Sequence, residues 1–208
     1  MKGLIIKDLK NLKKYSRTVL IMIAFYILFM TMMENIQFLS GIVVLMCAVS
    51  VITSFAYDKQ SGWDAYALTL PLPRKDFVLA KYALALLLTV FGTTVALLSG
   101  WLYGLFKGVS NFTETLLSSY TMFAAAVLFL CVMLPLVYRF GVERSRVLIF
   151  ALVALPTSSL IVLSQTGVLT MPEKTLLSQL FIFSPLVLIA CAAVSIALSY
   201  RIFKRKQA

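Results

Sequence analysis

Histidine is absent from the 208-residue sequence. Because histidine is the commonest general base and the commonest metal ligand, its absence excludes an Asp-His-Ser hydrolase and a histidine-dependent zinc enzyme. A Gly-x-x-x-x-Gly-Lys-Ser/Thr phosphate loop is also absent, so the chain cannot bind nucleotide phosphates in the usual way. Its cysteines, Cys47, Cys131 and Cys191, all lie in apolar runs, which favours packing over a disulfide or metal framework. The sequence therefore predicts no catalytic, cofactor-binding or metal-binding residue in this chain.

Charge is missing from six long runs of the sequence, at residues 18–33, 38–56, 82–105, 115–138, 147–164 and 176–200. Each run is near the ~20 residues that a helix needs to cross a bilayer core of about 30 Å. The apolar content of 61% and the mean hydropathy of +0.96 agree with one integral membrane domain. We therefore predict an all-α, polytopic membrane protein with six transmembrane helices.

The cations show which side of the membrane each loop faces. Seventeen of the 19 Lys and Arg residues lie in the N-terminal arm, the 57–81 loop, the 139–146 loop and the C-terminal tail, whereas the other loops hold only Lys107 and Lys174. The positive-inside rule then places both ends of the chain in the cytoplasm. Because these cations flank apolar spans, anionic lipid headgroups are a better partner for them than nucleic acid.

The N-terminal arm has two faces when residues 1–15 are placed at 100° steps. One arc is apolar, and the opposite arc carries Lys7, Lys10 and Lys14. This pattern predicts an amphipathic helix along the inner membrane surface, with its lysines at the headgroups. Asp8 is the one discordant residue on the apolar arc, and it could face another part of the protein. The alternative is a merely basic start that obeys the positive-inside rule.

The 57–81 loop contains a second predicted helix, from about Gly62 to Leu68. Ser61 and Asp64 resemble a capping box at its start, and Pro71 would end it. A further helix should begin near Asp76 and run into the third span. The apolar side of the loop helix carries Trp63, Tyr66, Ala67 and Leu70. Its two aromatic residues favour a docking surface, with an interfacial aromatic belt as the alternative.

The predicted spans contain no carboxylate, although carriers driven by protons or sodium usually keep one near mid-membrane. If the protein moves something, the energy should therefore come from another subunit. Two other classes remain open, a non-transporting membrane sensor or immunity protein and a lipid-modifying membrane enzyme. The enzyme would need an interfacial catalytic cluster, for which Asp58, Asp64 and Asp76 are the only candidates, and these look like helix caps.

Three stretches of sequence, taken with the six spans and the N-terminal helix, resemble the ABC-2-type transporter permeases. They are residues 55–58 (Phe-Ala-Tyr-Asp), 63–71 (Trp-Asp-Ala-Tyr-Ala-Leu-Thr-Leu-Pro) and 74–82 (Arg-Lys-Asp-Phe-Val-Leu-Ala-Lys-Tyr). Within this family the chain is similar to the small bacterial group of phenol-soluble modulin exporter permeases. It departs from the family at Pro73, where members commonly carry Ser or Thr.

The resemblance implies one ABC-2-type transmembrane domain over residues 1–208, in a bacterial plasma membrane. It implies a second permease, identical or homologous, and two separate ATP-binding subunits that would hold the ATP and Mg. Residues 1–17 would be the elbow helix, and the 57–81 loop would carry the coupling helix. The residues expected to dock on the ATPase are Trp63, Asp64, Tyr66, Ala67 and Leu70. The uncharged spans favour outward transport of amphipathic peptides or other hydrophobic cargo.

The family resemblance also bears on the outer region. In ABC-2 permeases this region often folds back into the membrane as short re-entrant helices, and residues 157–178 fit that role. Such backbone breaks survive at membrane depth only where protein or water satisfies the freed groups. The alternative is a proline-kinked helix followed by an exposed loop. The candidate outer-gate residues are Pro156, Ser159, Gln165 and Pro172.

Overall fold

The computed structural model describes residues 2–30, 36–69, 73–108, 112–145, 147–148, 150–151 and 174–206. The helices are α1 (Lys2–Met30), α2 (Ile36–Gln60), α3 (Trp63–Thr69), α4 (Arg74–Lys107), α5 (Phe112–Phe140) and α7 (Lys174–Lys206). The described part of the chain contains no strand. The predicted all-α class is therefore confirmed.

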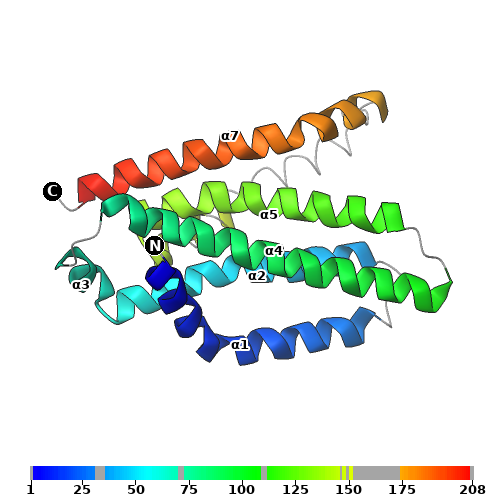
Figure 1. The fold of residues 1–208 in the computed structure, drawn as a ribbon, viewed down its shortest axis with the longest axis horizontal. Helices are drawn as coiled ribbons and strands as arrows, with labels where there is room; N and C mark the ends of the chain where they lie inside the picture. Colours follow the sequence, from blue (N-terminus) through cyan, green and yellow to red (C-terminus); the bar gives the residue numbers. More distant parts are fainter. Residues whose placement is uncertain are drawn as a thin grey trace.

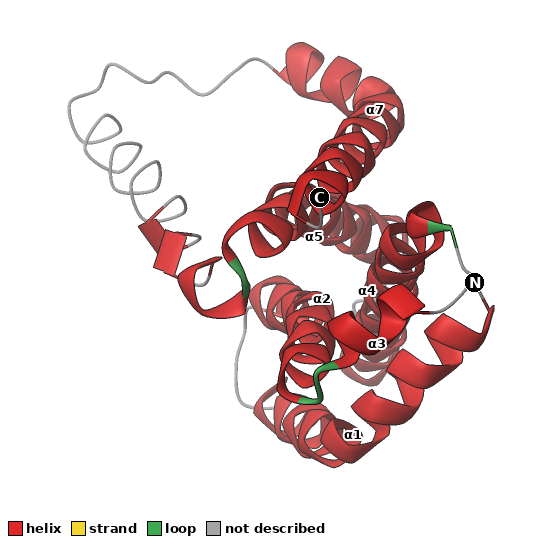
Figure 2. Ribbon diagram, turned by 90° about the vertical axis from the view of Figure 1, so that its left-hand side faces the viewer, coloured by secondary structure: helices red, strands yellow, loops and turns green. Residues whose placement is uncertain are grey.

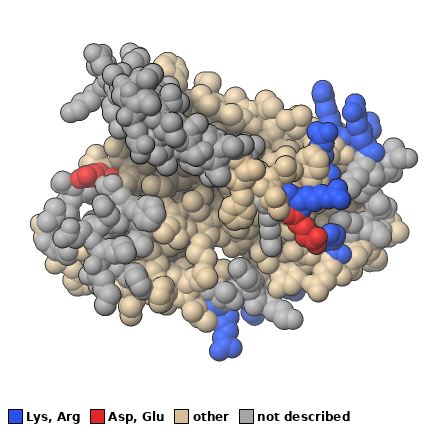
Figure 3. Space-filling view, turned by 180° about the vertical axis from the view of Figure 1, so that it is seen from behind, with Lys and Arg blue, Asp and Glu red and all other residues tan. Residues whose placement is uncertain are grey.

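Most of the helices run side by side along the long axis of the molecule (Figure 1). The short helix α3 lies across one end of this bundle, and the two ends of the chain lie at the same end. On the face drawn in Figure 3, most Lys and Arg side chains also gather toward this end. The arrangement agrees with the predicted grouping of basic segments, while their orientation across a membrane stays a prediction.

Four described helices are long and apolar enough to cross a membrane: Gly41–Gln60, Arg74–Phe106, Phe112–Phe140 and Phe183–Arg205. They correspond to the second, third, fourth and sixth predicted spans. Helix α1 is not among them over its described residues, since Lys13, Lys14 and Arg17 precede its apolar half. The fifth predicted span lies almost wholly outside the described residues, so the six-span topology stays a prediction.

Helix α1 joins the predicted inner-surface helix and the predicted first span into one element. Its N-terminal part crosses the end of the bundle, and the rest turns to run along α2 (Figures 1 and 2). The apolar arc predicted for residues 1–15 is partly buried here, with Leu4 and Leu12 both less than a tenth exposed. This part of α1 therefore packs on protein through much of its apolar face.

The core forms where α2 packs against α1, α4 and α5. Its buried members are small or branched apolar residues: Leu12, Val44, Ala48, Val51, Leu84, Ala85, Ala96, Ala126, Leu130 and Leu134. Helices α2 and α4 approach so closely that a Cβ placed on Gly92 would lie 2.8 Å from the Cβ of Cys47. Glycine is required at this crossing because any side chain would force the two helices apart.

The outer faces of the bundle are strongly apolar. Large exposed side chains cover α1, α4 and α7, among them Leu20, Phe25, Leu86, Leu102, Phe106, Leu186 and Ile189. An exposed apolar surface of this extent is typical of a membrane or protein interface and not of a surface in water. The structure thus agrees with the apolar spans in describing a multi-pass membrane protein.

Candidate functional site

Four charged residues and one serine meet inside the α3 end of the bundle. Lys7 and Asp8 come from α1, Ser54 and Asp58 from α2, and Lys81 from α4. Lys7 Nζ lies 2.7 Å from Asp58 Oδ1 and 3.1 Å from Asp8 Oδ1. Lys81 Nζ lies 3.1 Å from Asp8 Oδ1 and also pairs with Asp58 Oδ2. We call these five residues the charge cluster.

The charge cluster is buried and electrically balanced. Asp8 is 2% exposed, Asp58 4% and Lys81 8%. Lys81 donates to Ser54 Oγ at 2.7 Å besides its two carboxylate partners, so the three donors of its ammonium group are all used. Two ammonium groups therefore face two carboxylates, the condition under which buried charges are tolerated. Within the described ranges, no three potential metal ligands come together.

Helix α3 is attached to the charge cluster through Trp63. Lys7 Nζ lies 4.1 Å from the centre of the Trp63 ring, a favourable cation–π distance. On the next turn Ala67 is buried, whereas Tyr66 is 59% exposed. One side of α3 thus rests on the bundle and the other presents the Tyr66 ring outward. Figure 2 shows α3 lying over the end of the bundle.

The connection before α3 is tight. Gly62 has φ +64°, a left-handed conformation that glycine adopts without strain. The Ser61 hydroxyl, predicted to open a capping box, donates to the Asp58 carbonyl at 3.2 Å and so closes α2. Asp58 consequently binds α1 and α4 through its carboxylate and the start of the turn through its backbone. The turn and the charge cluster form one unit.

Aromatic residues surround the charge cluster. Lys81 Nζ lies 4.9 Å from the centre of the Phe55 ring, and that ring meets Tyr138 edge-on at 5.1 Å. Tyr138 packs in turn on Phe203 of α7 at 5.9 Å. These rings bring α5 and α7 against the same end of the bundle. They also keep the surroundings of the ion pairs apolar, where electrostatic interactions are strong.

A second polar contact holds α7 farther along the bundle. The Tyr82 hydroxyl lies 2.6 Å from Ser195 Oγ and 2.8 Å from Ser199 Oγ. Ser195 also donates to the Cys131 carbonyl at 2.6 Å. These bonds join α4, α5 and α7. The residue of α4 that forms them, Tyr82, directly follows Lys81 of the charge cluster.

Of the residues predicted to dock on an ATPase, Trp63 and Tyr66 lie side by side, with their ring centres 5.4 Å apart, and the docking role stays a prediction. Tyr66 faces outward, Trp63 rests on Lys7 and Ala67 is buried. The Asp64 side chain and Leu70 lie outside the described part of the structure, as do the outer-gate residues Pro156, Ser159, Gln165 and Pro172 and most of the 157–178 segment.

The three lysines predicted to lie at the headgroups of the inner membrane surface differ in their surroundings. Lys7 does not face the headgroups but turns inward to the carboxylates, because Asp8 and Asp58 provide partners there. Lys10 is exposed. The side chain of Lys14 is not among those described.

Sequence reasoning missed the charge cluster as a unit. The sequence shows Asp8 as discordant on its apolar arc but gives it no partner, it predicts a helix cap at Asp58, and it places Lys81 only among the loop cations. A usable signal was present, since Asp58 and Lys81 lie at the facing ends of two consecutive predicted spans. Antiparallel helices place such residues at the same depth.

Comparison with known families gives the assignment. Residues 3–204 match the profile of a family described as "ABC-2 family transporter protein". No curated protein and no solved structure matched the chain. Because the match spans nearly the whole sequence, the chain belongs to the ABC-2 family of transporter proteins, whose members are membrane components of transport systems.

Proposed function

We propose that the chain is the transmembrane permease subunit of an ATP-driven ABC exporter. Two separate ATP-binding subunits would energise it, and a second permease, identical or homologous, would complete the pathway. The observation that carries this proposal is the placement of α3, which presents Tyr66 outward and fastens Trp63 to the charge cluster. A short helix of this kind can be displaced by a protein bound to its exposed side and can transmit that displacement to the helices beneath it.

Transmission follows from the contacts beneath α3. Trp63 contacts Lys7, Lys7 pairs with Asp58, and Asp58 pairs with Lys81. A displacement of α3 therefore acts on α1, α2 and α4 together. Separating any one of these helices from the others would leave a buried charge without its partner, which commonly costs about 3–5 kcal/mol. The helices are thus expected to move as a group.

The division of labour with the ATP-binding subunits follows from what the sequence contains. ATP and Mg would be bound by those subunits, since the chain has no phosphate loop. This chain would supply the pathway and no enzymatic chemistry. We propose amphipathic peptides or other hydrophobic molecules as cargo, moved outward across a bacterial plasma membrane. The support is the apolar character of the helices together with the resemblance of residues 55–58, 63–71 and 74–82 to that exporter group, which stays a prediction from the sequence. Family membership does not favour a non-transporting sensor or immunity protein.

The test compares two exposed aromatic residues, Tyr66 on α3 and Phe106 near the end of α4 that lies farthest from α3. Tyr66→Ala should weaken copurification with the ATP-binding subunit by about thirtyfold in affinity, the effect of removing an interface aromatic worth about 2 kcal/mol. Phe106→Ala is the matched control, because Phe106 is 87% exposed near the far end of α4. Membrane insertion should be unchanged in both variants. Equal ATPase binding and transport by the two variants would reject α3 as the coupling element.

A further inference from the structure

The seam between α1 and α2 contains three cavities. Two lie along the apolar part of the seam, with volumes of ≈ 430 Å³ and ≈ 260 Å³, and both are bounded by Val19, Met22, Ile42 and Met46. The third, of ≈ 400 Å³, lies at the α3 end and is bounded by Lys10, Asn11, Tyr57, Gln60 and Ser61. Cavities of this size fall in or near the range of about 300–1,000 Å³ that is usual for small-molecule sites.

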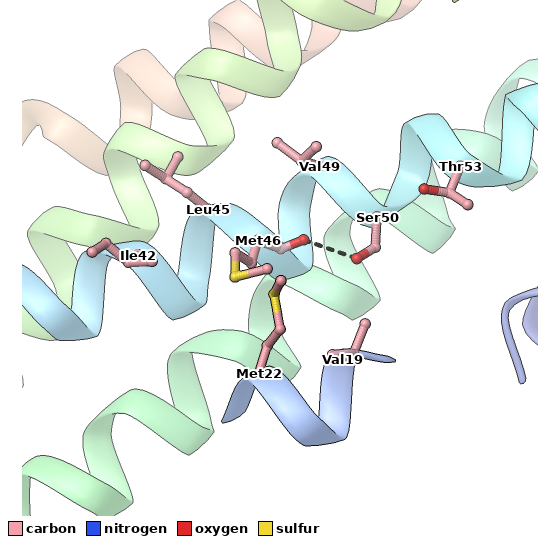
Figure 4. Close-up of a pocket in the computed structure, with 8 residues that line it drawn as sticks. All are labelled: Val19, Met22, Ile42, Leu45, Met46, Val49, Ser50 and Thr53. Atoms are coloured by element: carbon pink, nitrogen blue, oxygen red, sulfur yellow. Dashed lines mark hydrogen bonds between the residues drawn. The ribbon is translucent and has the colours of Figure 1, made fainter. Parts of the chain in front are cut away.

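The walls of the two apolar cavities offer almost nothing polar. Figure 4 shows the smaller one, in which Met22 of α1 approaches Met46 of α2, while Val19, Leu45 and Val49 also line the cavity. The Ser50 hydroxyl in this wall donates to the Met46 carbonyl at 2.8 Å, so its hydrogen is already used. Two methionines meet at the centre, and methionine adapts its shape to irregular apolar ligands. These walls suit hydrocarbon.

The third cavity has the opposite character. Its described lining carries a lysine, two amides and two hydroxyl groups, and among the described residues no carboxylate lines any of the three cavities. Lys10 is exposed, and within the described part of the chain it forms no ion pair, unlike Lys7. The α3 end of the seam therefore carries an uncompensated positive charge beside several hydrogen-bonding groups. This combination is suited to a phosphate diester.

The polar and apolar parts follow one another along one face of α2. Leu45, Val49, Thr53 and Tyr57 are four residues apart, which places them on the same side of the helix, and Gln60 continues that side. At 1.5 Å per residue, the distance from Leu45 to Gln60 is about 22 Å. This is half of the total bilayer thickness of about 40–45 Å. The seam thus has the length and the polarity gradient of one lipid leaflet.

We propose that the α1/α2 seam is a binding site for an anionic phospholipid from the leaflet at the α3 end. Its phosphate lies against Lys10, Asn11 and Gln60, and its acyl chains fill the cavities around Met22 and Met46. A net negative headgroup is preferred over a zwitterionic one because Lys10 is the one charged residue among the described residues that line the cavities. The proposal does not rest on the transport function, since it needs only the chain and a lipid.

The experiment measures lipid binding to the purified full-length chain in detergent. Phosphatidylglycerol and phosphatidylcholine with identical acyl chains are titrated separately, and bound lipid is counted by native mass spectrometry. Phosphatidylglycerol should bind more tightly. Lys10→Gln should lower its affinity about fivefold, the effect of one basic residue near an anionic lipid, and should leave phosphatidylcholine unchanged. Lys204→Gln, which removes an exposed cation from α7, is the matched control and should change neither affinity.

The apolar half of the site is tested separately. Val49→Trp should fill the smaller cavity and lower the binding affinity of both lipids. Leu98→Trp, on the exposed face of α4, should leave both affinities unchanged. Thermal melting of each variant checks that it is folded. Glycerol phosphate, a headgroup without chains, should not compete. Equal binding of the two lipids, equal losses in Lys10→Gln and Lys204→Gln, equal effects of the two tryptophans, or full competition by glycerol phosphate would each overturn the proposal.

Discussion

Replacing Lys81 with methionine is expected to destabilise the protein by about 3–5 kcal/mol, the usual cost of breaking a buried ion pair. Methionine keeps most of the side-chain volume but removes the ammonium group that pairs with Asp8 and Asp58. Lys7 would remain as the only cation beside two buried carboxylates. The loss should therefore come from uncompensated charge and not from a cavity.

The assay is thermal melting of the purified protein, with Lys59→Met as the control. Lys59 pairs with Glu143 at 3.6 Å, but the two side chains are 62% and 87% exposed. An exposed pair is commonly worth less than about 1 kcal/mol. For a chain of this size, 1 kcal/mol corresponds to about 2–4 °C, so Lys81→Met should lower the melting temperature by roughly 10 °C and Lys59→Met by far less.

A second substitution separates charge balance from the loss of a contact. Asp8→Asn added to Lys81→Met leaves one cation, Lys7, facing one carboxylate, Asp58. The double variant should therefore melt above Lys81→Met although it carries more changes, a coupling that distant sites do not show. If Lys81→Met and Lys59→Met melt together, or if Asp8→Asn lowers the melting temperature further, the charge cluster does not have the energetic role assigned to it.

Two further outcomes are expected. Gly92→Ala should lower the free energy of unfolding by about 1–3 kcal/mol, because the new Cβ would lie 2.8 Å from the Cβ of Cys47 on α2. Gly3→Ala is the control: its Cβ would meet open space, so it should raise the melting temperature slightly. Equal shifts in melting temperature would contradict the close crossing of α2 and α4. The native cysteines are replaced, and single cysteines are introduced at Lys206 and Lys174. In whole cells, the cysteine at 206 should react only with membrane-permeant reagents, and the one at 174 should also react with impermeant reagents. Labelling of position 206 by an impermeant reagent would contradict the predicted orientation.

The spans could be predicted from the sequence because the bilayer acts on each segment separately. A charge-free run must form its own backbone hydrogen bonds wherever it lies, so α2, α4, α5 and α7 follow from composition alone. The loop helix was also predicted closely, from about Gly62 to Leu68 against Trp63–Thr69 in the structure. Its start depends on local turn chemistry at Gly62, a glycine that the sequence shows directly.

The charge cluster could not be predicted in the same way, because it depends on contacts between distant residues. Lys7 and Asp58 are 51 positions apart, and Asp8 and Lys81 are 73 apart. Helical periodicity shows that Asp8 lies on an apolar arc but not which helix covers that arc. For the same reason the contact between Trp63 and Lys7 could not be predicted. Placing residues at 100° steps shows on which side of a helix each residue lies. Whether that side is exposed depends on which other helices pack against it.

The order in which the chain is made has a consequence for the charge cluster. Lys7 and Asp8 are synthesised before their partners, since Asp58 lies near the end of α2 and Lys81 lies in α4. Until those helices are made, the first helical turns have no permanent partner and must remain in water or at the lipid headgroups, where their charges are solvated. The amino-terminal segment is therefore expected to settle into place late in biogenesis. Correct insertion of α4 is therefore the condition for closing the α3 end of the bundle, and a misinserted α4 would leave the first turns of α1 accessible to proteases.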